Sequence, residues 1–144
     1  DLIRPEVLPN LVITPHPGEM ARLMGVSTED IQDRRFEHLL KFATTRKINI
    51  VLKGAHTLIA NANGQVYFSP FRNPGLATAG AGDVLAGIIA GLIAQGYKPA
   101  TAAAMGVYIH GYAGEILAQE IGHEGITASR ISQTAGRALK RLVS

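Results

Sequence analysis

Apolar residues occur along this chain in two patterns: short uninterrupted runs, and longer stretches in which they repeat every three or four positions. The runs at residues 11–13 and 48–52 are typical of buried strands, and Pro15 ends the first of them. A brief helix is expected at residues 19–24. A longer one begins at Ser27, which can cap it. The inward face of that longer helix is expected to consist of Ile31, Leu39, Leu40 and Ala43.

The middle of the chain predicts a β-hairpin, because segments 56–59 and 65–68 flank the strong turn signal Asn63-Gly64. Three helices are expected after it: a buried one along residues 84–93, an alanine-rich one at 99–119, and one from about Thr127 onward. Strand–helix–strand, hairpin and packed helices together indicate an α/β sheet covered by helices. In such sheets, ligands bind beyond the carboxyl ends of the strands.

Composition indicates an ordered globular domain. Of the 144 residues, 47% are hydrophobic and 17% are charged, which is enough apolar material for one ordinary core. The chain has no cysteine, which excludes disulfides and thiolate metal sites. No apolar stretch is long enough to span a bilayer and no signal peptide is visible, so a cytoplasmic protein is expected. The net charge of +3 suits small anions, and no basic block interleaved with aromatics predicts nucleic-acid binding.

The most informative segment is the loop at residues 73–83, with the sequence NPGLATAGAGD. It places Gly80, Ala81 and Gly82 at a helix N-terminus, where free N–H groups bind anions. It is neither a P-loop nor a dinucleotide fingerprint, because it lacks the Lys-Ser/Thr pair and the third glycine. Asp83 would repel a phosphate unless it had a chemical task, such as taking a proton from an attacking hydroxyl. The alternative is that Asp83 merely caps its helix.

Two further segments each follow a predicted strand, TPHPGEM at residues 14–20 and KGAHT at residues 53–57. His16 lies between two prolines, on a loop with little freedom to lose on binding. Lys53 offers a point charge to a phosphate, unless it simply ends a strand at the surface. Glu19 either caps its helix or binds a magnesium-bound water. All three motifs are expected to converge at the carboxyl edge of the sheet.

In this order, the three segments resemble the C-terminal part of the NAD(P)H-hydrate dehydratase family, within the ribokinase-like superfamily. Many ribokinase-like kinases share the Gly-Ala-Gly-Asp element, whereas the His-Pro-Gly-Glu element is more specific to the dehydratases. The resemblance extends over essentially the whole chain. It implies a three-layer α/β/α fold, with a mostly parallel sheet flanked by helices and a β-hairpin. Residues 1–144 would then be the C-terminal portion of one domain whose N-terminal half is missing.

The resemblance also implies an activity, the repair of hydrated NADH and NADPH by a nucleotide-dependent lyase. ADP or ATP, carrying Mg²⁺, would phosphorylate the ring hydroxyl, and the phosphate would then eliminate. His16 and Asp83 would contact the hydrated dinucleotide, with Asp83 as the catalytic base. The amides of the glycine loop would stabilise the transferring phosphoryl group. The residues implied in holding the nucleotide are Lys53, Gly54, Ala55, His56, Thr57 and Gly82.

No protein metal site is expected, because the histidines lack partners at metal-ligand spacing, and magnesium would arrive with the nucleotide. Members of the family assemble as homo-oligomers, often tetramers, and no membrane partner is implied. Asn73 and Thr78 either orient the glycine loop or touch the nucleotide. Two alternative functions stay open: a ribokinase-like kinase for a vitamin precursor or sugar, and a nucleotide-binding module without catalysis.

Overall fold

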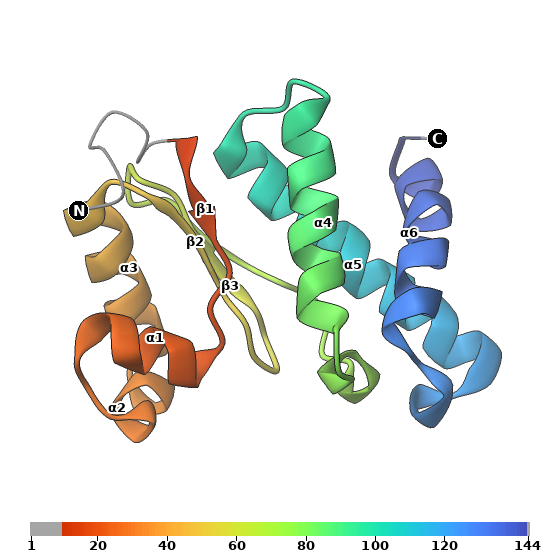
Figure 1. Cartoon of the computed structure of the whole chain (residues 1–144), viewed down its shortest axis with the longest axis horizontal. Helices are drawn as coiled ribbons and strands as arrows, with labels where there is room; N and C mark the ends of the chain where they lie inside the picture. Colours follow the sequence, from red (N-terminus) through yellow and green to blue (C-terminus); the bar gives the residue numbers. More distant parts are fainter. Residues whose placement is uncertain (1–9, 144) are drawn as a thin grey trace.

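The computed structural model describes residues 10–143, which form three layers with a sheet between two groups of helices (Figure 1). On one side lie α1 (Pro17–Met24), α2 (Thr28–Asp33) and α3 (Arg35–Arg46), and on the other α4 (Ala81–Ala94), α5 (Pro99–Ile121) and α6 (Ala128–Val143). The strands are β1 (Val12–Ile13), β2 (Asn49–Leu52), β3 (Leu58–Ala60) and β4 (Val66–Phe68). Two short 3-10 helices, η2 (Pro74–Ala77) and η3 (His123–Gly125), precede α4 and α6. The three-layer α/β/α prediction is confirmed.

The described strands form one mixed sheet in the order β1-β2-β3-β4. β1 and β2 run parallel, with Val12 opposite Asn49. β2–β3 and β3–β4 are antiparallel, with Val51 opposite Ile59 in the first pair. This corrects the expectation of a mostly parallel sheet for the strands described here. The expected hairpin supplies β3 and β4, and strands joined by a short turn pair antiparallel.

Alternation along β2 and β3 gives each face of the sheet its own apolar core. Ile50 and Leu52 pack with the helices α1 to α3, in a cluster that contains Met20, Ile31, Leu39 and Ala43. Val51 and Ile59 point to the other face and pack with α4, α5 and α6. The uninterrupted burial of β2 explains why its sequence is a continuous apolar run rather than an alternating one.

The helix expected from Ser27 onward is two helices. Ser27 caps α2 as predicted, its Oγ accepting from the N–H of Asp30 at 3.1 Å. The chain then leaves helical geometry at Arg34, with φ −129° and ψ 44°. The carboxylate of Asp30 accepts from Nε of Arg34 at 3.0 Å, which holds the end of α2 against the start of α3. Of the residues predicted to face inward, Ile31 on α2 and Leu39 and Ala43 on α3 are buried, whereas Leu40 is only half-buried.

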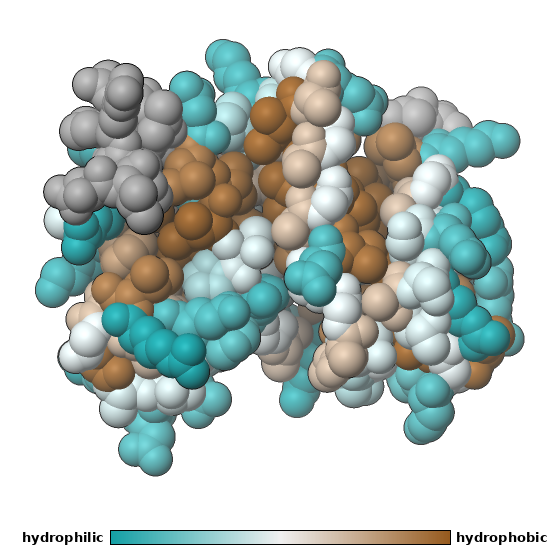
Figure 2. All heavy atoms as spheres, in the orientation of Figure 1, coloured by the Kyte–Doolittle hydropathy of each residue, from teal (hydrophilic) through white to brown (hydrophobic). Residues whose placement is uncertain are grey.

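The apolar sequence of α4 predicted a buried helix, and the structure buries only one side of it. Leu85, Ile89 and Leu92 are buried, whereas Ala86 and Ala90 are exposed on its other side. Figure 2 shows apolar side chains gathered over β1 and along α4, with polar ones over α6. Within residues 10–143, no helix has the length and apolar character needed to cross a membrane.

α4 and α5 approach closely because α5 carries a glycine where they meet. A Cβ atom added at Gly106 would lie 2.5 Å from Cγ1 of Ile89. Gly106→Ala is therefore expected to lower the free energy of unfolding by about 1–3 kcal/mol, the usual effect of overpacking a core. Gly87→Ala on α4 is the matched control, because a Cβ atom added at Gly87 would meet no neighbouring atom within 4 Å. That change should raise stability by about 0.5–1 kcal/mol. Urea unfolding of the two variants measures the contrast, and equal effects would contradict it.

Candidate active site

The ends of β1 and β2 are tied together where the chain leaves the sheet. The N–H of Lys53 donates to the carbonyl of Pro15 at 2.9 Å, one step beyond the regular pairing of the two strands. This bond brings the loop that carries His16 beside the loop that begins at Lys53. The sequence prediction that these two motifs meet at the carboxyl edge of the sheet is confirmed.

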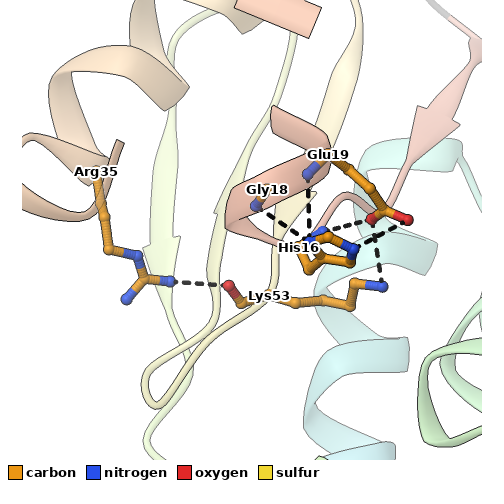
Figure 3. A network of polar contacts seen from close by, with 5 residues as sticks. All are labelled: His16, Gly18, Glu19, Arg35 and Lys53. Carbon is orange, nitrogen blue, oxygen red and sulfur yellow. Dashed lines mark hydrogen bonds and ion pairs between the residues drawn. The ribbon is translucent and has the colours of Figure 1, made fainter. Parts of the chain in front are cut away.

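His16 caps α1 through a reciprocal pair of hydrogen bonds (Figure 3). Its Nδ1 accepts from the N–H groups of Gly18 and Glu19, at 3.1 and 3.2 Å. The Oε2 atom of Glu19 accepts from the N–H of His16 at 2.7 Å. In the neutral ring the proton must therefore be on Nε2, because Nδ1 is an acceptor. Of the two roles considered for Glu19, the structure shows the capping one.

Lys53 joins all three motifs. Its Nζ atom lies 3.7 Å from Oε2 of Glu19. The same Nζ lies 3.1 Å from the position that a Cβ atom would take at Gly82, at the start of α4. A larger residue at position 82 would press on the lysine, so glycine leaves room for the ammonium beside the helix N-terminus. The cation thus lies beside Glu19 of the His16 loop (Figure 3) and, on its other side, beside Gly82 of the glycine loop.

The environment of Glu19 favours its ionised form. The hydrogen bond from the backbone N–H of His16 is the main influence that lowers the pKa of the Glu19 carboxyl, and the Lys53 charge adds to it. Because this pKa is lower in the folded protein, the stabilisation is present above the ordinary carboxyl value. It is lost as the pH falls through the lower folded-state pKa.

Glu19→Gln is expected to reduce the free energy of unfolding by less than about 1 kcal/mol near neutral pH, since the side chain is half-exposed. The reduction should vanish in acid, where both side chains are neutral. Denaturant unfolding at two pH values tests this, with Glu29→Gln on α2 as the control. A reduction of the same size at both pH values would contradict the role of the charge.

Arg35, at the start of α3, holds the loop after β2 through hydrogen bonds to its backbone. Its Nη2 atom donates to the carbonyls of Leu52 and Lys53, at 3.2 and 3.3 Å. A Cβ atom at Gly54 would lie 2.6 Å from that Nη2 atom, so a larger residue there would have to displace the guanidinium. Burial lowers the pKa of the Arg35 guanidinium. Sequence reasoning missed this residue, because no motif connects it to residues 53–57.

The glycine loop forms the predicted helix N-terminus. Gly80 is the N-cap of α4, with φ at 82°, a left-handed conformation that favours glycine. Asp83 is exposed in the first turn of α4, three residues past the cap, so it is not the N-cap. The N–H of Ala81 donates to the carbonyl of Thr78 at 3.2 Å, and that of Asp83 to Gly80 at 3.1 Å. Of the expected amides, those of Gly80 and Gly82 have no acceptor among the described residues.

Two adjoining cavities open at this edge of the sheet. The larger, of about 580 Å³, is lined by His16, Lys53 and Arg72 among others. The smaller, of about 110 Å³, is lined by Lys53, Gly82 and Thr57 among others. The residues that line both are Lys53, Gly54, Ala55, Asn73 and Leu76. His56 and Asp83 are exposed and line neither cavity, so their predicted roles stay predictions.

Asn73 anchors residues 71–77, the segment over the cavities, which contributes to the lining of both. Its Oδ1 accepts from the N–H of Gly75 at 2.9 Å, and its Nδ2 donates to Oε1 of Glu115 on α5 at 3.2 Å. Nδ1 of His123 lies 2.9 Å from the same Oδ1, which fixes this imidazole nitrogen as the donor. The structure therefore shows the orienting role that was one of the two considered for Asn73. The carbonyl of Thr78 likewise holds the glycine loop.

Several lining residues escaped the sequence analysis, among them Phe71, Arg72 and His110. Arg72 directly precedes the NPG motif, and this position was the one available signal for it. His110 carried no signal, because it reaches the site across a helix interface. Within residues 10–143, no group of three or more His, Cys, Asp or Glu side chains is arranged to hold a metal ion.

A glycine-capped helix with Asp in its first turn, at the carboxyl edge of a three-layer α/β/α sheet, places the chain in the ribokinase-like class. A ribokinase-like superfamily protein of Enterococcus faecalis shares the fold, with a TM-score of 0.80 and 34% identity. That likeness covers 93% of this chain and 45% of the other. Residues 4–137 match the family model for NAD(P)H-hydrate dehydratase, and the chain belongs to that family.

Two relatives define the likeness further. The bifunctional NAD(P)H-hydrate repair enzyme of Moorella thermoacetica is 54% identical over 118 residues, which are 82% of this chain and 22% of that protein. The ADP/ATP-dependent NAD(P)H-hydrate dehydratase of Bacillus subtilis was crystallised with ATP and Mg²⁺ and soaked with CoA. It matches with a TM-score of 0.86 and 35% identity, over 90% of this chain and 48% of its own. The chain thus spans less than half the length of each of these proteins.

Proposed function

We propose that this chain carries the phosphoryl-transfer centre of an enzyme that restores hydrated NADH and NADPH at the expense of ADP or ATP. The observation that carries the proposal is the position of Lys53, which borders both cavities and lies beside Gly82. A phosphoryl group that is transferred from one ligand to another is stabilised by a cation that lies beside both ligands. The names of the Moorella and Bacillus subtilis relatives support this activity.

The proposed arrangement assigns one ligand to each side of Lys53. The hydrated nicotinamide ring lies at the mouth of the larger cavity, between His16, which lines that cavity, and Asp83, which lies outside it in the first turn of α4. The nucleotide phosphates lie at the smaller cavity, held by Lys53, the loop 54–57 and Gly82. The open amides of Gly80 and Gly82 fit an anion, because a helix N-terminus presents unpaired N–H groups and a favourable dipole. Mg²⁺ bound to the nucleotide neutralises charge on its phosphates.

The chemistry proceeds in two steps. Asp83 takes the proton of the ring hydroxyl while the oxygen of that hydroxyl bonds to the terminal phosphorus of the nucleotide. The bond between that phosphorus and the rest of the nucleotide breaks in the same step. The open amides and Lys53 stabilise the charge on the transferring oxygens. Phosphate then leaves with the electrons of the C–O bond while the neighbouring ring carbon loses a proton to solvent, and the electrons of that C–H bond restore the double bond. The net result is loss of water from the ring and hydrolysis of one nucleotide phosphate bond.

Residues 1–144 act as one portion of a single ribokinase-like domain, in the cytoplasm. The protein works as a homo-oligomer, which the exposed aromatic side chains of Phe36, Tyr67 and Phe68 support as a contact surface. His56 and Thr57 contact the nucleotide together with Ala55.

The test is recovery of NADH absorbance from hydrated NADH, using the intact polypeptide that carries this chain. Reactions contain Mg²⁺ and either ADP, ATP or no nucleotide. Recovery that requires a nucleotide is the expected result, and the more effective nucleotide identifies the donor. No recovery from a folded protein that binds ADP or ATP would overturn the proposed activity.

A further inference from the structure

His110 is a buried titratable residue that the proposed chemistry does not use. It lies on α5, is 9% exposed, and lines the smaller cavity together with Lys53 and Gly82. Its Nε2 atom lies 3.0 Å from the carbonyl oxygen of Ala81, the first residue of α4. The contact therefore joins the middle of one helix to the first turn of another, at the glycine loop.

The chemistry of the two groups determines the direction of this bond. A carbonyl oxygen only accepts, so Nε2 must carry the proton and donate it. Burial lowers the pKa of the His110 imidazole, although the bond to Ala81 opposes that effect. The neutral ring with its proton on Nε2 is thus the form that the site stabilises. A helical carbonyl has a second lone pair, so it can accept from His110 as well as from its own helix.

Packing holds His110 in position for this bond. Gly106, one turn earlier on α5, lets the helix approach Ile89 of α4. Gly111 lies directly against Phe71, where a Cβ atom would be 2.3 Å from Cδ2 of the ring. Glu115 ties the next turn of α5 to Asn73. The helix that carries His110 is therefore fixed to both α4 and the segment over the cavities.

We propose that His110 is a positioning residue for the glycine loop. Its hydrogen bond to Ala81 holds the first turn of α4, so that the amide of Gly82 and the carboxylate of Asp83 keep their orientation toward the transferring phosphoryl group. The effect on turnover rests on the function proposed above, whereas the effect on loop order does not. His110 itself touches neither reacting atom.

Three variants test the proposal. His110→Leu removes the donor in a similar volume, and His110→Gln keeps an N–H donor near the position of Nε2. Thr134→Val, at a buried site on α6, is the control for a general loss of stability. The expected loss of kcat in His110→Leu is about 10- to 100-fold, because a misplacement of about 1 Å at the reacting groups can cost about 100-fold. KM should change little, and His110→Gln should recover most of the kcat.

Hydrogen exchange supplies a second measurement that needs no activity. In His110→Leu, amides of residues 83–86 should exchange faster, while those of His110→Gln and Thr134→Val should match the parent protein. Unchanged exchange and unchanged kcat in His110→Leu would overturn the proposal. Equal losses in the Leu and Gln variants would also overturn it, because packing alone would then explain them. If the parent protein shows no turnover, the proposed function fails, and the exchange result alone decides whether His110 orders the loop.

Discussion

Asp83→Asn is expected to lower kcat about 10²- to 10⁴-fold, the range typical of losing a general base. Asparagine has nearly the same shape as aspartate but cannot take the proton of the attacking hydroxyl. Because Asp83 is exposed in the first turn of α4 and lines neither cavity, the substitution should leave the fold and the nucleotide affinity unchanged. Steady-state kinetics and calorimetric titration with ADP and ATP measure the two quantities separately.

Asp33→Asn is the matched control for that experiment, because Asp33 is also an exposed aspartate but ends α2. It should leave kcat unchanged. If Asp83→Asn retains most of the parent kcat, the proton is taken elsewhere and the proposed base is wrong. If both kcat and nucleotide affinity are lost together, Asp83 shapes the loop rather than the chemistry.

Lys53→Met is expected to weaken ADP and ATP binding about 10- to 100-fold. A hydrogen bond to a charged group contributes about 1.5–3 kcal/mol, and each 1.4 kcal/mol is a factor of ten. Methionine keeps much of the apolar stem but removes the ammonium that lies between Glu19 and Gly82. The Glu19 carboxylate is then left facing the bound phosphates without its cation, which adds repulsion.

The double variant Lys53→Met/Glu19→Gln separates these two effects. It should bind nucleotide more tightly than Lys53→Met alone, because the unpaired carboxylate is gone. Lys41→Met, an exposed lysine on α3, is the control and should bind as the parent protein does. An unchanged affinity in Lys53→Met would place the phosphates away from the junction of the two cavities.

Local sequence patterns predicted most of the helices and strands, but not where a helix breaks or how the strands pair. The apolar run of β2 and the turn at Asn63-Gly64 were sufficient for a strand and a hairpin. The break between α2 and α3 was not predictable, because Ile31, Leu39 and Ala43 keep a helical spacing across it. It depends on the backbone of Arg34 and on the contact of that side chain with Asp30.

The candidate site likewise contains some contacts that the sequence could predict and others that it could not. The meeting of His16 with Lys53 could be predicted, because both follow strands and the ends of parallel strands share one edge. Arg35 and His110 could not, since their bonds to Lys53 and Ala81 cross 18 and 29 residues without a spacing rule. Nor could the sequence tell that the N–H of Ala81 is used by Thr78, because that depends on the turn before α4.

The fate of the phosphoryl group tests the central claim most directly. Hydrated NADH, Mg²⁺ and the preferred nucleotide are incubated with the intact polypeptide, and NADH and inorganic phosphate are measured in the same reaction. The account predicts that both appear in equal amounts, one of each for every nucleotide consumed. Nucleotide consumption that leaves a stable phosphorylated product and no NADH would contradict it, and would identify a small-molecule kinase built on the same fold.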